Sequence, residues 1–512
     1  MDKKIEDFCK ANNYTVYDHK TRPSEKKNII TLFEKQSSQV KLAPSLEKAI
    51  ENSELKNGMT ISFHHHFRGG DYIVNQVMAV LDKMGFKDLN VVSSSLSAVH
   101  KPLTGYIKNG LIKRIETSGL RGELAEEISE GIMDEPVIFR SHGGRAAAIT
   151  DGEIHINVAF LGASSCDLMG NANGYTREGV GKTMCGSLGY ARIDAQYADH
   201  VIIITDNLVP YPNVPFGISQ RYVDQIVLVD AVGDAEKIMA GATRFTKKPD
   251  DLLIARKATE VIVRSGYFYN GFSIQTGSGG ASLAVTRFLG EYMREQNVTA
   301  GFALGGITGA MVKLHEEGLI KRLLDVQSFD LDAATSLKNN RFHQQIDADY
   351  YASPFDKGSA VNLLDAVVLS ALEIDTSFNV NVLTGSDGVI RGAVGGHQDT
   401  AAGAALCIVV APLLRGRIPT VVKQVNTVVT PGWSVDVVVT DRGTAVNPAR
   451  QDIIKRLVDS HVELTTIEEL QKKAESLVGI PEPLPLGNKT VGVVTYRDGS
   501  VIDVIMNIKE DI

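Results

Sequence analysis

Three consecutive histidines, His64–His66, stand directly before the segment Phe67-Arg68-Gly69-Gly70. Neighbouring positions on a strand point to opposite faces, so three histidines in a row cannot all bind one metal ion without a turn. No acidic residue stands at the ligand spacing of an HExxH zinc motif. Histidines and an arginine beside flexible glycines can instead bind an anion. Two interpretations stay open: some of these side chains bind an anion, or they form a structural cluster.

Glycine-rich turns are the second candidate feature. Gly179–Thr183 (GVGKT) resembles the end of a phosphate-binding loop, but Thr176 stands where that loop needs a glycine, which favours a plain turn. Neither the GxSxG pattern of hydrolases nor the GxGxxG pattern of dinucleotide-binding folds occurs. Three other turns contain Thr276–Gly280, Leu304–Gly309 and Gly392–Asp399. At strand ends, such turns can offer backbone N–H groups to an oxyanion or let a narrow thioester arm approach closely.

The elements that must position these turns follow an α/β pattern. Short β-branched runs such as Val201–Thr205, Ile226–Asp230 and Val435–Thr440 predict buried strands, and Asp251–Ser265 has helical periodicity. The polar connector Arg244–Asp251 divides the chain almost in half. We therefore expect two α/β domains that meet near residue 246.

The two halves resemble each other. Each opens with a strand, a glycine-rich turn and a helix, at Thr60–Val80 and at Ser273–Gly290. Each also has a strand followed by an acid and a polar turn, at Asn157–Gly174 and at Ala371–Gly385. This pattern predicts a duplicated α/β unit with the active site between the copies. The expected divisions are an N-terminal arm (1–45), domain 1 (46–246), and domain 2 with a C-terminal helix and a hairpin at Asp498-Gly499 (247–512).

Composition limits the function classes. The chain has 512 residues, 53 Lys and Arg against 61 Asp and Glu, and a formal net charge of −8, which disfavours a nucleic-acid or anionic-membrane partner. The longest apolar stretch, residues 401–414, is interrupted by Gly403 and Pro412 and predicts a buried element instead of a membrane span. The N-terminal sequence fits no signal or transit peptide, so we expect a cytoplasmic protein. The four cysteines form no metal-binding spacing and are expected to be small buried side chains.

Several motifs, taken in order, resemble the α/β CoA-transferases. In the first half these are Ser165–Asn171 (SCDLMGN) and Tyr197–Ile203 (YADHVII), and in the second half Ile274–Gly280 (IQTGSGG), Gly395–Asp399 (GGHQD) and Val439–Gly443 (VTDRG). The resemblance spans roughly residues 45 to 450. It implies two tandem α/β/α open-sheet domains of the type also found in sugar-phosphate isomerases (NagB/RpiA-like).

Within that superfamily, the chain most resembles the citrate lyase α-subunit family, through HHHFRGGDYIVN, Asn171–Lys182, Val326–Thr335 and Ala393–Gly403. The implied activity is a CoA-transferase reaction of citrate metabolism, which exchanges acetate for citrate on a thioester of CoA or of an acyl carrier protein. CoA-transferases that form a glutamyl thioester carry their nucleophilic Glu in a turn that aligns with residues 303–306. Leu304 occupies that position and cannot form an acyl anhydride. The resemblance implies that no such residue is needed, because the citrate carboxylate itself attacks the acetyl thioester.

Such a reaction requires alignment of two anions and donors for a third charge. Candidate oxyanion or close-approach residues are Gly305, Gly306, Gly395 and Gly396. Candidate substrate-binding residues are His65, His66, Arg68, Gly69, Gly70, Ser278, Gly279, Gly280 and His397.

The resemblance also implies an oligomeric complex with two partners. One is an acyl carrier (γ) subunit with a phosphoribosyl-dephospho-CoA arm, and the other is a lyase (β) subunit. No tightly bound cofactor or metal is expected in this chain. Transfer to citramalate or another short carboxylate, and a non-catalytic acyl-CoA-binding module, remain as alternatives.

Overall fold

The computed structural model describes residues 3–13, 41–176, 184–238, 246–277 and 279–508. It divides into two units, residues 1–40 and 41–512. The first unit contains α1 (Lys3–Asn12), and every other element belongs to the second. The four cysteines are free and buried, as predicted. Among the described residues, no helix combines the length and apolar character needed to cross a membrane.

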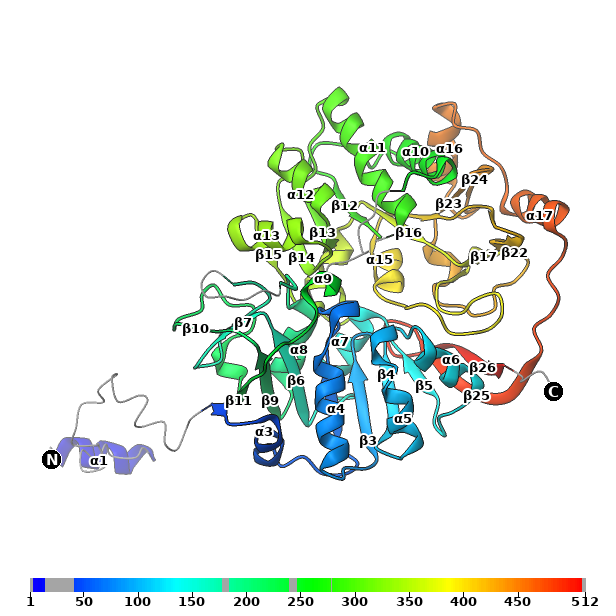
Figure 1. Ribbon diagram of the computed structural model, residues 1–512. Helices are drawn as coiled ribbons and strands as arrows, with labels where there is room; N and C mark the ends of the chain where they lie inside the picture. Colours follow the sequence, from blue (N-terminus) through cyan, green and yellow to red (C-terminus); the bar gives the residue numbers. More distant parts are fainter. Residues whose placement is uncertain (1–2, 14–40, 177–183, 239–245, 278, 509–512) are drawn as a thin grey trace. The chain divides into compact units, whose positions relative to one another are not determined.

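The first large sheet is built by the N-terminal half of the second unit together with the C-terminal hairpin (Figure 1). Its strands, in spatial order, are β1 (Leu42–Ala43), β11 (Gln225–Leu228), β9 (His200–Thr205), β6 (Val158–Ala163), β2 (Thr60–Phe63), β3 (Leu89–Ser93), β4 (Ile112–Thr117), β5 (Val137–Phe139), β25 (Leu486–Thr495) and β26 (Val501–Ile508). All neighbours are parallel except β25 and β26. The connecting helices are α3 (Leu46–Asn52), α4 (Ile73–Lys83), α5 (Leu103–Lys108), α6 (Glu123–Glu130), α7 (His142–Thr150), α8 (Gly189–Tyr197) and α9 (Ala235–Ile238). The central strands are almost entirely buried, as expected for a parallel sheet covered on both faces.

The second large sheet is built by the C-terminal half. Its order is β15 (His343–Gln345), β14 (Leu323–Ser328), β13 (Phe302–Ile307), β12 (Ser273–Thr276), β16 (Ala366–Ser370), β19 (Leu406–Val410), β23 (Val437–Thr440) and β24 (Gly443–Val446). Only β23 and β24 are antiparallel. Its helices are α10 (Pro249–Arg264), α11 (Gly280–Gln296), α12 (Gly309–Glu316), α13 (Leu331–Asn339), α14 (Ala348–Ala352), α15 (His397–Gly403), α16 (Gln451–Asp459) and α17 (Ile467–Val478).

The predicted duplication is visible in the strand order. In the first sheet, β2 has β3, β4 and β5 on one side and β6, β9 and β11 on the other. In the second sheet, β12 has β13, β14 and β15 on one side and β16, β19 and β23 on the other. Each half also carries a small three-stranded sheet. One contains β7 (Ser165–Asp167), β8 (Ala172–Asn173) and β10 (Leu208–Val209), and the other β17 (Glu373–Asp375), β18 (Val380–Asn381) and β22 (Val421–Val422).

The acid and polar turn of each half form the same local structure. Asp167 accepts the backbone N–H of Asn171 at 3.1 Å and its side-chain amide at 2.8 Å. Asp375 accepts the backbone N–H of Asn379 at 3.0 Å and its side-chain amide at 3.1 Å. Both acids therefore fix a tight turn by satisfying its N–H groups.

The C-terminal hairpin forms, but it extends the first sheet. Strand β25 pairs in parallel with β5, with Val493 opposite Ile138, and Thr495 donates its hydroxyl to the carbonyl of Phe139 at 3.2 Å. The chain thus returns from the second half to cover the open edge of β5. The sheet boundary lies between β11 and β12, and the proposed division at residues 246/247 stays a prediction.

Candidate functional site

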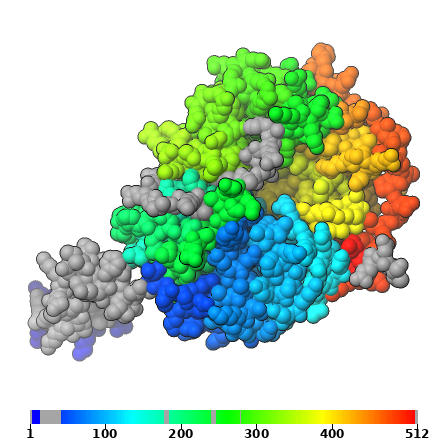
Figure 2. Space-filling view, in the orientation of Figure 1, coloured from blue at the N-terminus to red at the C-terminus, as the bar shows by residue number. Residues whose placement is uncertain are grey.

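A cavity of about 630 Å³ lies between the two halves of the second unit. In Figure 2 these halves meet along a seam between the blue-to-cyan and the green-to-yellow surfaces. The cavity is lined by residues at the carboxyl ends of strands in both sheets, where parallel α/β folds bind ligands. Of the predicted site residues, it contains His65, Arg68, Gly69, Gly306, Gly395, Gly396 and His397.

His65 is the histidine of the block that reaches the cavity. Its Nε2 donates to Oε1 of Gln327 at 3.1 Å, and its Nδ1 lies 2.6 Å from Oγ of Ser94. Ser94 Oγ also accepts the backbone N–H of His65, so the serine hydroxyl donates to Nδ1. Burial, with His142 and Arg68 nearby, lowers the pKa of His65 well below its usual range. His65 is therefore a neutral residue with both ring nitrogens occupied.

Its neighbours His64 and His66 are buried. His64 Nε2 lies 3.0 Å from the backbone nitrogen of Gly162 in β6, and burial lowers the pKa of His64 to about 4. His66 is fully buried and does not line the cavity, and among the described residues its ring nitrogens have no hydrogen-bond partner. The block thus contains core side chains on both sides of one cavity residue.

Arg68 connects the two halves. Its guanidinium donates to the carbonyls of Ser328 at 2.7 Å and Phe329 at 3.1 Å, and it lies 4.8 Å from the centre of the Phe329 ring. Burial lowers its pKa to about 10, so it stays charged at neutral pH. Arg68 has a backbone φ of +51°, an uncommon conformation for a residue with a side chain.

The Gly395-Gly396 turn is held against the first half. Val394 donates its N–H to the carbonyl of Ser118 at 2.7 Å, and His142 donates its N–H to the carbonyl of Gly395 at 2.8 Å. A Cβ on Gly396 would lie 2.5 Å from the hydroxyl of Tyr351, so only glycine fits there. The turn is therefore closely packed.

His397, the next residue, lines the cavity with its ring nitrogens occupied. Its Nδ1 lies 2.7 Å from Oγ1 of Thr430, and its Nε2 donates to the carbonyl of Ser370 at 3.1 Å. Burial lowers the pKa of His397 to about 4.

Gly305 and Gly306 form an irregularity in β13, where the register against β14 shifts. Gly305 has a φ of +93°, and a Cβ on Gly306 would lie 2.2 Å from the ring of Phe329. Gly306 lines the cavity and Gly305 does not. The preceding Leu304 is fully buried in the hydrophobic core.

The remaining predicted residues lie elsewhere. Gly279 and Gly280, at the start of α11, line a second cavity of about 540 Å³, which shares Ser370 and Arg415 with the first. Gly70 is buried, and a Cβ there would lie 2.5 Å from the carbonyl oxygen of Asp234. Ser278, like the GVGKT segment, lies outside the described residues.

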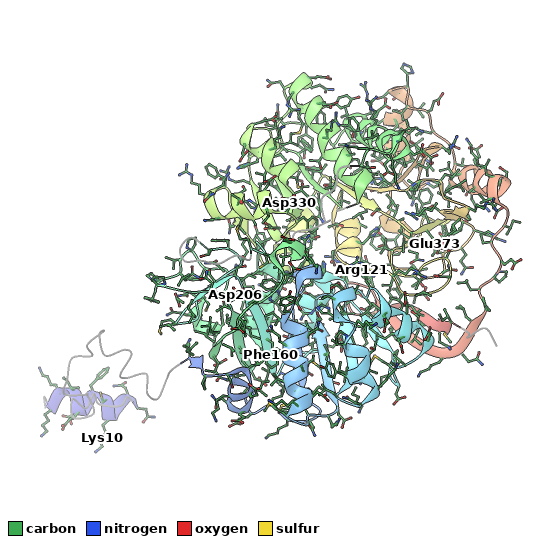
Figure 3. All side chains as sticks on the ribbon, viewed as in Figure 1. Lys10, Arg121, Phe160, Asp206, Asp330 and Glu373 are labelled. Carbon is green, nitrogen blue, oxygen red and sulfur yellow. The ribbon has the colours of Figure 1, made fainter. Side chains whose placement is uncertain are left out.

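Several cavity residues were not predicted from the sequence. They are Arg121, His142, Tyr190, Gln275, Gln327, Tyr351 and Arg415, among others. Arg121 follows β4 and lies where the two halves meet (Figure 3). Its side chain is exposed to solvent, the surrounding protein partly desolvates the guanidinium and lowers its pKa, and within the described part of the chain it has no acidic or hydrogen-bonding partner. The one available sequence signal was its position between glycines after a strand (SGLRG).

Arg415 is engaged by its own half. It donates to the backbone carbonyls of Leu372, at 2.7 Å, and Ala371. No group of three or more His, Cys, Asp or Glu residues is arranged to hold a metal ion in the ranges that the structure describes.

Comparison with known proteins identifies the family. A family model described as "Citrate lyase, alpha subunit (CitF)" matches residues 39–508. The citrate lyase alpha chain of Haemophilus influenzae is 60% identical over 470 residues, which cover 92% of this chain and 93% of that protein. A solved citrate lyase α subunit from Streptococcus mutans, in complex with citrate, has a TM-score of 0.90 and 56% identity over 98% of both chains.

A more distant structure shows the fold alone. The 4-hydroxybutyrate CoA-transferase of Porphyromonas gingivalis has a TM-score of 0.52 and 15% identity, over 87% of this chain and 99% of that one. The predicted CoA-transferase-type α/β fold is thereby confirmed. The chain belongs to the citrate lyase α-subunit family.

Proposed function

We propose that this chain exchanges acetate for citrate on a carrier thioester without a covalent enzyme intermediate. A citrate carboxylate oxygen attacks the acetyl thioester carbonyl, the C–S bond breaks, and a thiolate and an acetic–citric anhydride form. The thiolate then attacks the citryl carbonyl, and acetate leaves with the bridging oxygen. Both steps pass through an oxyanion, which positioned N–H donors stabilise.

The charge of the cavity wall carries this proposal. The described residues that line the cavity include four arginines, of which Arg391 pairs with Asp387 behind the wall, and no Asp or Glu; the histidines among them add hydrogen-bonding groups instead of charge. A wall of this kind suits a substrate with three carboxylates. Among its described residues there is also no carboxylate that could become an acyl anhydride, in agreement with the buried Leu304.

Specific roles follow from the contacts. Arg121 is available to bind a citrate carboxylate because its guanidinium is not engaged by any described residue. Arg68, from the same half as Arg121, adds positive charge, although two of its N–H groups are occupied by the carbonyls of Ser328 and Phe329 in the second half. The backbone N–H groups at Gly306, Gly395 and Gly396 are the proposed oxyanion donors or points of close approach.

The proposed partners are those of a citrate lyase complex. The thioester is carried by an acyl carrier subunit with a phosphoribosyl-dephospho-CoA arm, and a lyase subunit cleaves the citryl thioester to oxaloacetate and acetyl thioester. We place both partners outside this chain, which supplies the transfer step.

The test mixes the full-length chain with acetyl-CoA, as a carrier surrogate, and isotope-labelled citrate. Mass spectrometry is expected to find labelled citryl-CoA and acetate, with no acyl or CoA adduct on the protein. Arg121→Met should raise the KM for citrate about tenfold or more, since a hydrogen-bonded charge contributes about 1.5–3 kcal/mol. Arg114→Met, on an exposed arginine that pairs with Glu135, is the matched control and should leave the KM unchanged.

Two results would contradict the proposal. One is a stable acyl-enzyme adduct, which would require a covalent route. The other is the absence of citryl thioester with acetyl-CoA and with the acetylated carrier protein. Faster turnover of citramalate than of citrate would assign the chain to the alternative substrate.

A further inference from the structure

The four histidines that line the cavity differ in one respect. His65, His100 and His397 each have both ring nitrogens within hydrogen-bond distance of a described residue. His142 has neither ring nitrogen engaged by a described residue, and its Nδ1 is buried. A buried polar atom without a partner is uncommon in proteins and calls for an explanation. Among these histidines, only His142 has an Nε2 that is not engaged by a described residue, and this atom is available to a bound molecule.

The position of His142 places it beside the proposed oxyanion donors. It is the first residue of α7, and its backbone N–H donates to the carbonyl of Gly395 at 2.8 Å. Its Nε2 lies 3.8 Å from the point that a Cβ on Gly395 would occupy. The ring is packed against Tyr190, with centroids 4.2 Å apart, and stacks on His65 at 5.5 Å. The imidazole is thus held in one plane with an edge at the Gly395 turn.

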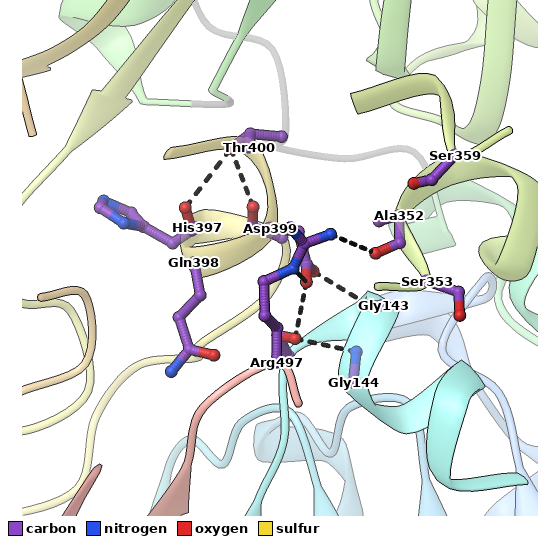
Figure 4. Close-up of polar contacts among 12 residues, drawn as sticks. Gly143, Gly144, Ala352, Ser353, Ser359, His397, Gln398, Asp399, Thr400 and Arg497 are labelled. Atoms are coloured by element: carbon purple, nitrogen blue, oxygen red, sulfur yellow. Dashed lines mark hydrogen bonds and ion pairs between the residues drawn. The ribbon is translucent and has the colours of Figure 1, made fainter. Parts of the chain in front are cut away.

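A buried carboxylate from the second half fixes this helix start (Figure 4). Asp399 in α15 is fully buried. It accepts the hydroxyl of Ser141 at 2.8 Å and the backbone N–H of Gly143 at 2.9 Å. These two residues flank His142 in the sequence, so the carboxylate holds the backbone on both sides of it.

The C-terminal hairpin completes the arrangement. Arg497, at the hairpin turn, has Nε 3.5 Å from Oδ1 of Asp399 and donates from Nη2 to the carbonyl of Ala352 at 2.9 Å. A Cβ on Gly143 would lie 2.0 Å from that same carbonyl oxygen, so helix α7 approaches Ala352 as closely as a glycine allows. Three segments that are distant in the sequence therefore meet at Asp399.

We propose that His142 is a catalytic hydrogen-bond donor that contacts the reacting acyl group, and that Asp399 is the positioning residue that sets its place. This inference rests on the proposed transfer reaction and names a side-chain donor for its oxyanion. We assign the single proton of the neutral imidazole to Nε2, because this atom faces the Gly395 side of the cavity whereas Nδ1 is buried.

The electrostatic surroundings favour a neutral donor. Burial, with a smaller contribution from Arg145, lowers the pKa of His142 to about 3, so the ring is uncharged at physiological pH. A neutral donor stabilises an oxyanion without giving up its proton, and a desolvated site strengthens that hydrogen bond.

The experiment compares His142→Phe, which keeps a flat ring but has no donor, with His142→Gln, whose amide nitrogen can replace Nε2. In the acetyl-CoA and citrate assay, His142→Phe is expected to lower kcat about 100-fold, the loss typical of one oxyanion donor, with the KM for both substrates changed less than threefold. His142→Gln should recover at least tenfold of that loss. A kcat within threefold of wild type in His142→Phe, or equal losses in both variants, would overturn the role of His142.

The role of Asp399 is tested by non-additivity. Asp399→Asn should lower kcat in the wild-type background but cause no further loss when combined with His142→Phe, because it acts through that ring. Equal losses in both backgrounds would show a general structural role and overturn the assignment. If Asp399→Asn does not fold, Ser141→Ala, which removes one ligand of the same carboxylate, replaces it in the same cycle.

Asp436→Asn is the matched control, since Asp436 is also buried, accepts a backbone N–H, from Cys407, and pairs with an arginine, Arg450. It lies away from the cavity lining and should leave kcat unchanged. All variants are compared by circular dichroism and thermal unfolding. Absence of citryl thioester in the wild-type reactions with acetyl-CoA and with the acetylated carrier protein would contradict the proposed function, whereas normal wild-type turnover with an active His142→Phe would contradict this inference alone.

Discussion

Asp399 should make this protein lose stability as the pH rises, the opposite of the usual effect of a carboxyl group in an ion pair. Its carboxyl is fully buried, and burial raises its pKa from the ordinary 3.8 to about 6 despite Arg497, Gly143 and Ser141 nearby. The folded state therefore binds this proton more tightly than the unfolded state. The stability that this tighter proton binding contributes is fully present below pH 3.8 and is lost as the pH rises through 6. The loss is about 3 kcal/mol, at 1.36 kcal/mol for each pKa unit.

Asp399→Asn removes this titration because the amide is neutral at every pH. The wild type should lose about 2.4 kcal/mol relative to the variant between pH 4 and pH 7, because about 0.6 of the 3 kcal/mol is already lost at pH 4. At an unfolding entropy of about 2.1 cal/mol/K per residue, that change shifts the difference between the two Tm values by about 2 °C for a chain of 512 residues. The assay is scanning calorimetry of both proteins across this pH range.

The control is Asp134→Asn, which removes a negative charge from an exposed turn. The Tm of this variant should change with pH in the same way as the Tm of the wild type. A Tm difference between wild type and Asp399→Asn that stays constant would refute the reasoning. So would a wild type that gains stability relative to the variant as the pH rises, because the ion pair with Arg497 would then outweigh the cost of burial.

Three further predictions concern packing in the site and in the core beside it. Gly306→Ala places a Cβ 2.2 Å from the ring of Phe329, so unfolding measurements should show a loss of about 1–3 kcal/mol, and the KM for citrate should rise. Arg145→Met leaves Asp194 buried without its two-pronged partner, bonded at 2.7 and 2.8 Å, and should cost about 3–5 kcal/mol; adding Asp194→Leu should recover part of it in a double-mutant cycle. Leu304→Glu buries a carboxylate in the core, so Tm should fall, and intact-protein mass spectrometry after incubation with acetyl-CoA should show no adduct.

The duplicated fold could be predicted from the sequence because its signals are local. Buried parallel strands produce continuous β-branched runs, and the acid and asparagine of each small sheet lie four residues apart. The hairpin could be predicted as an element, since Asp498-Gly499 favours a tight turn. The strand that the hairpin pairs with, β5, could not be predicted, because β25 and β5 are more than 350 residues apart in the sequence.

The site was predicted less completely, for a physical reason. The block of histidines is visible in the sequence, but which of its members reaches the cavity depends on how the chain turns after β2: His65 lines the cavity and His66 does not. His142 and Arg121 carry no motif. They matter because the start of α7 and the end of β4 are brought against Gly395 and Ala393 by contacts between the halves.

The two copies of the fold contribute unequally to the cavity. Arg415 and His397 of the second half are engaged by hydrogen-bond acceptors of that half, whereas Arg121 and His142 of the first half have no such partner among the described residues. The second half instead brings backbone close to the cavity, at turns such as Gly396, where a Cβ would collide with a neighbour. Among the described residues, the unengaged arginine and histidine of the cavity thus come from one copy, and turns of close backbone approach such as Gly396 come from the other. A duplicated fold can diverge in this way because the shared topology keeps the strand ends facing one another while each copy changes its side chains. The site therefore exists only where the two copies meet.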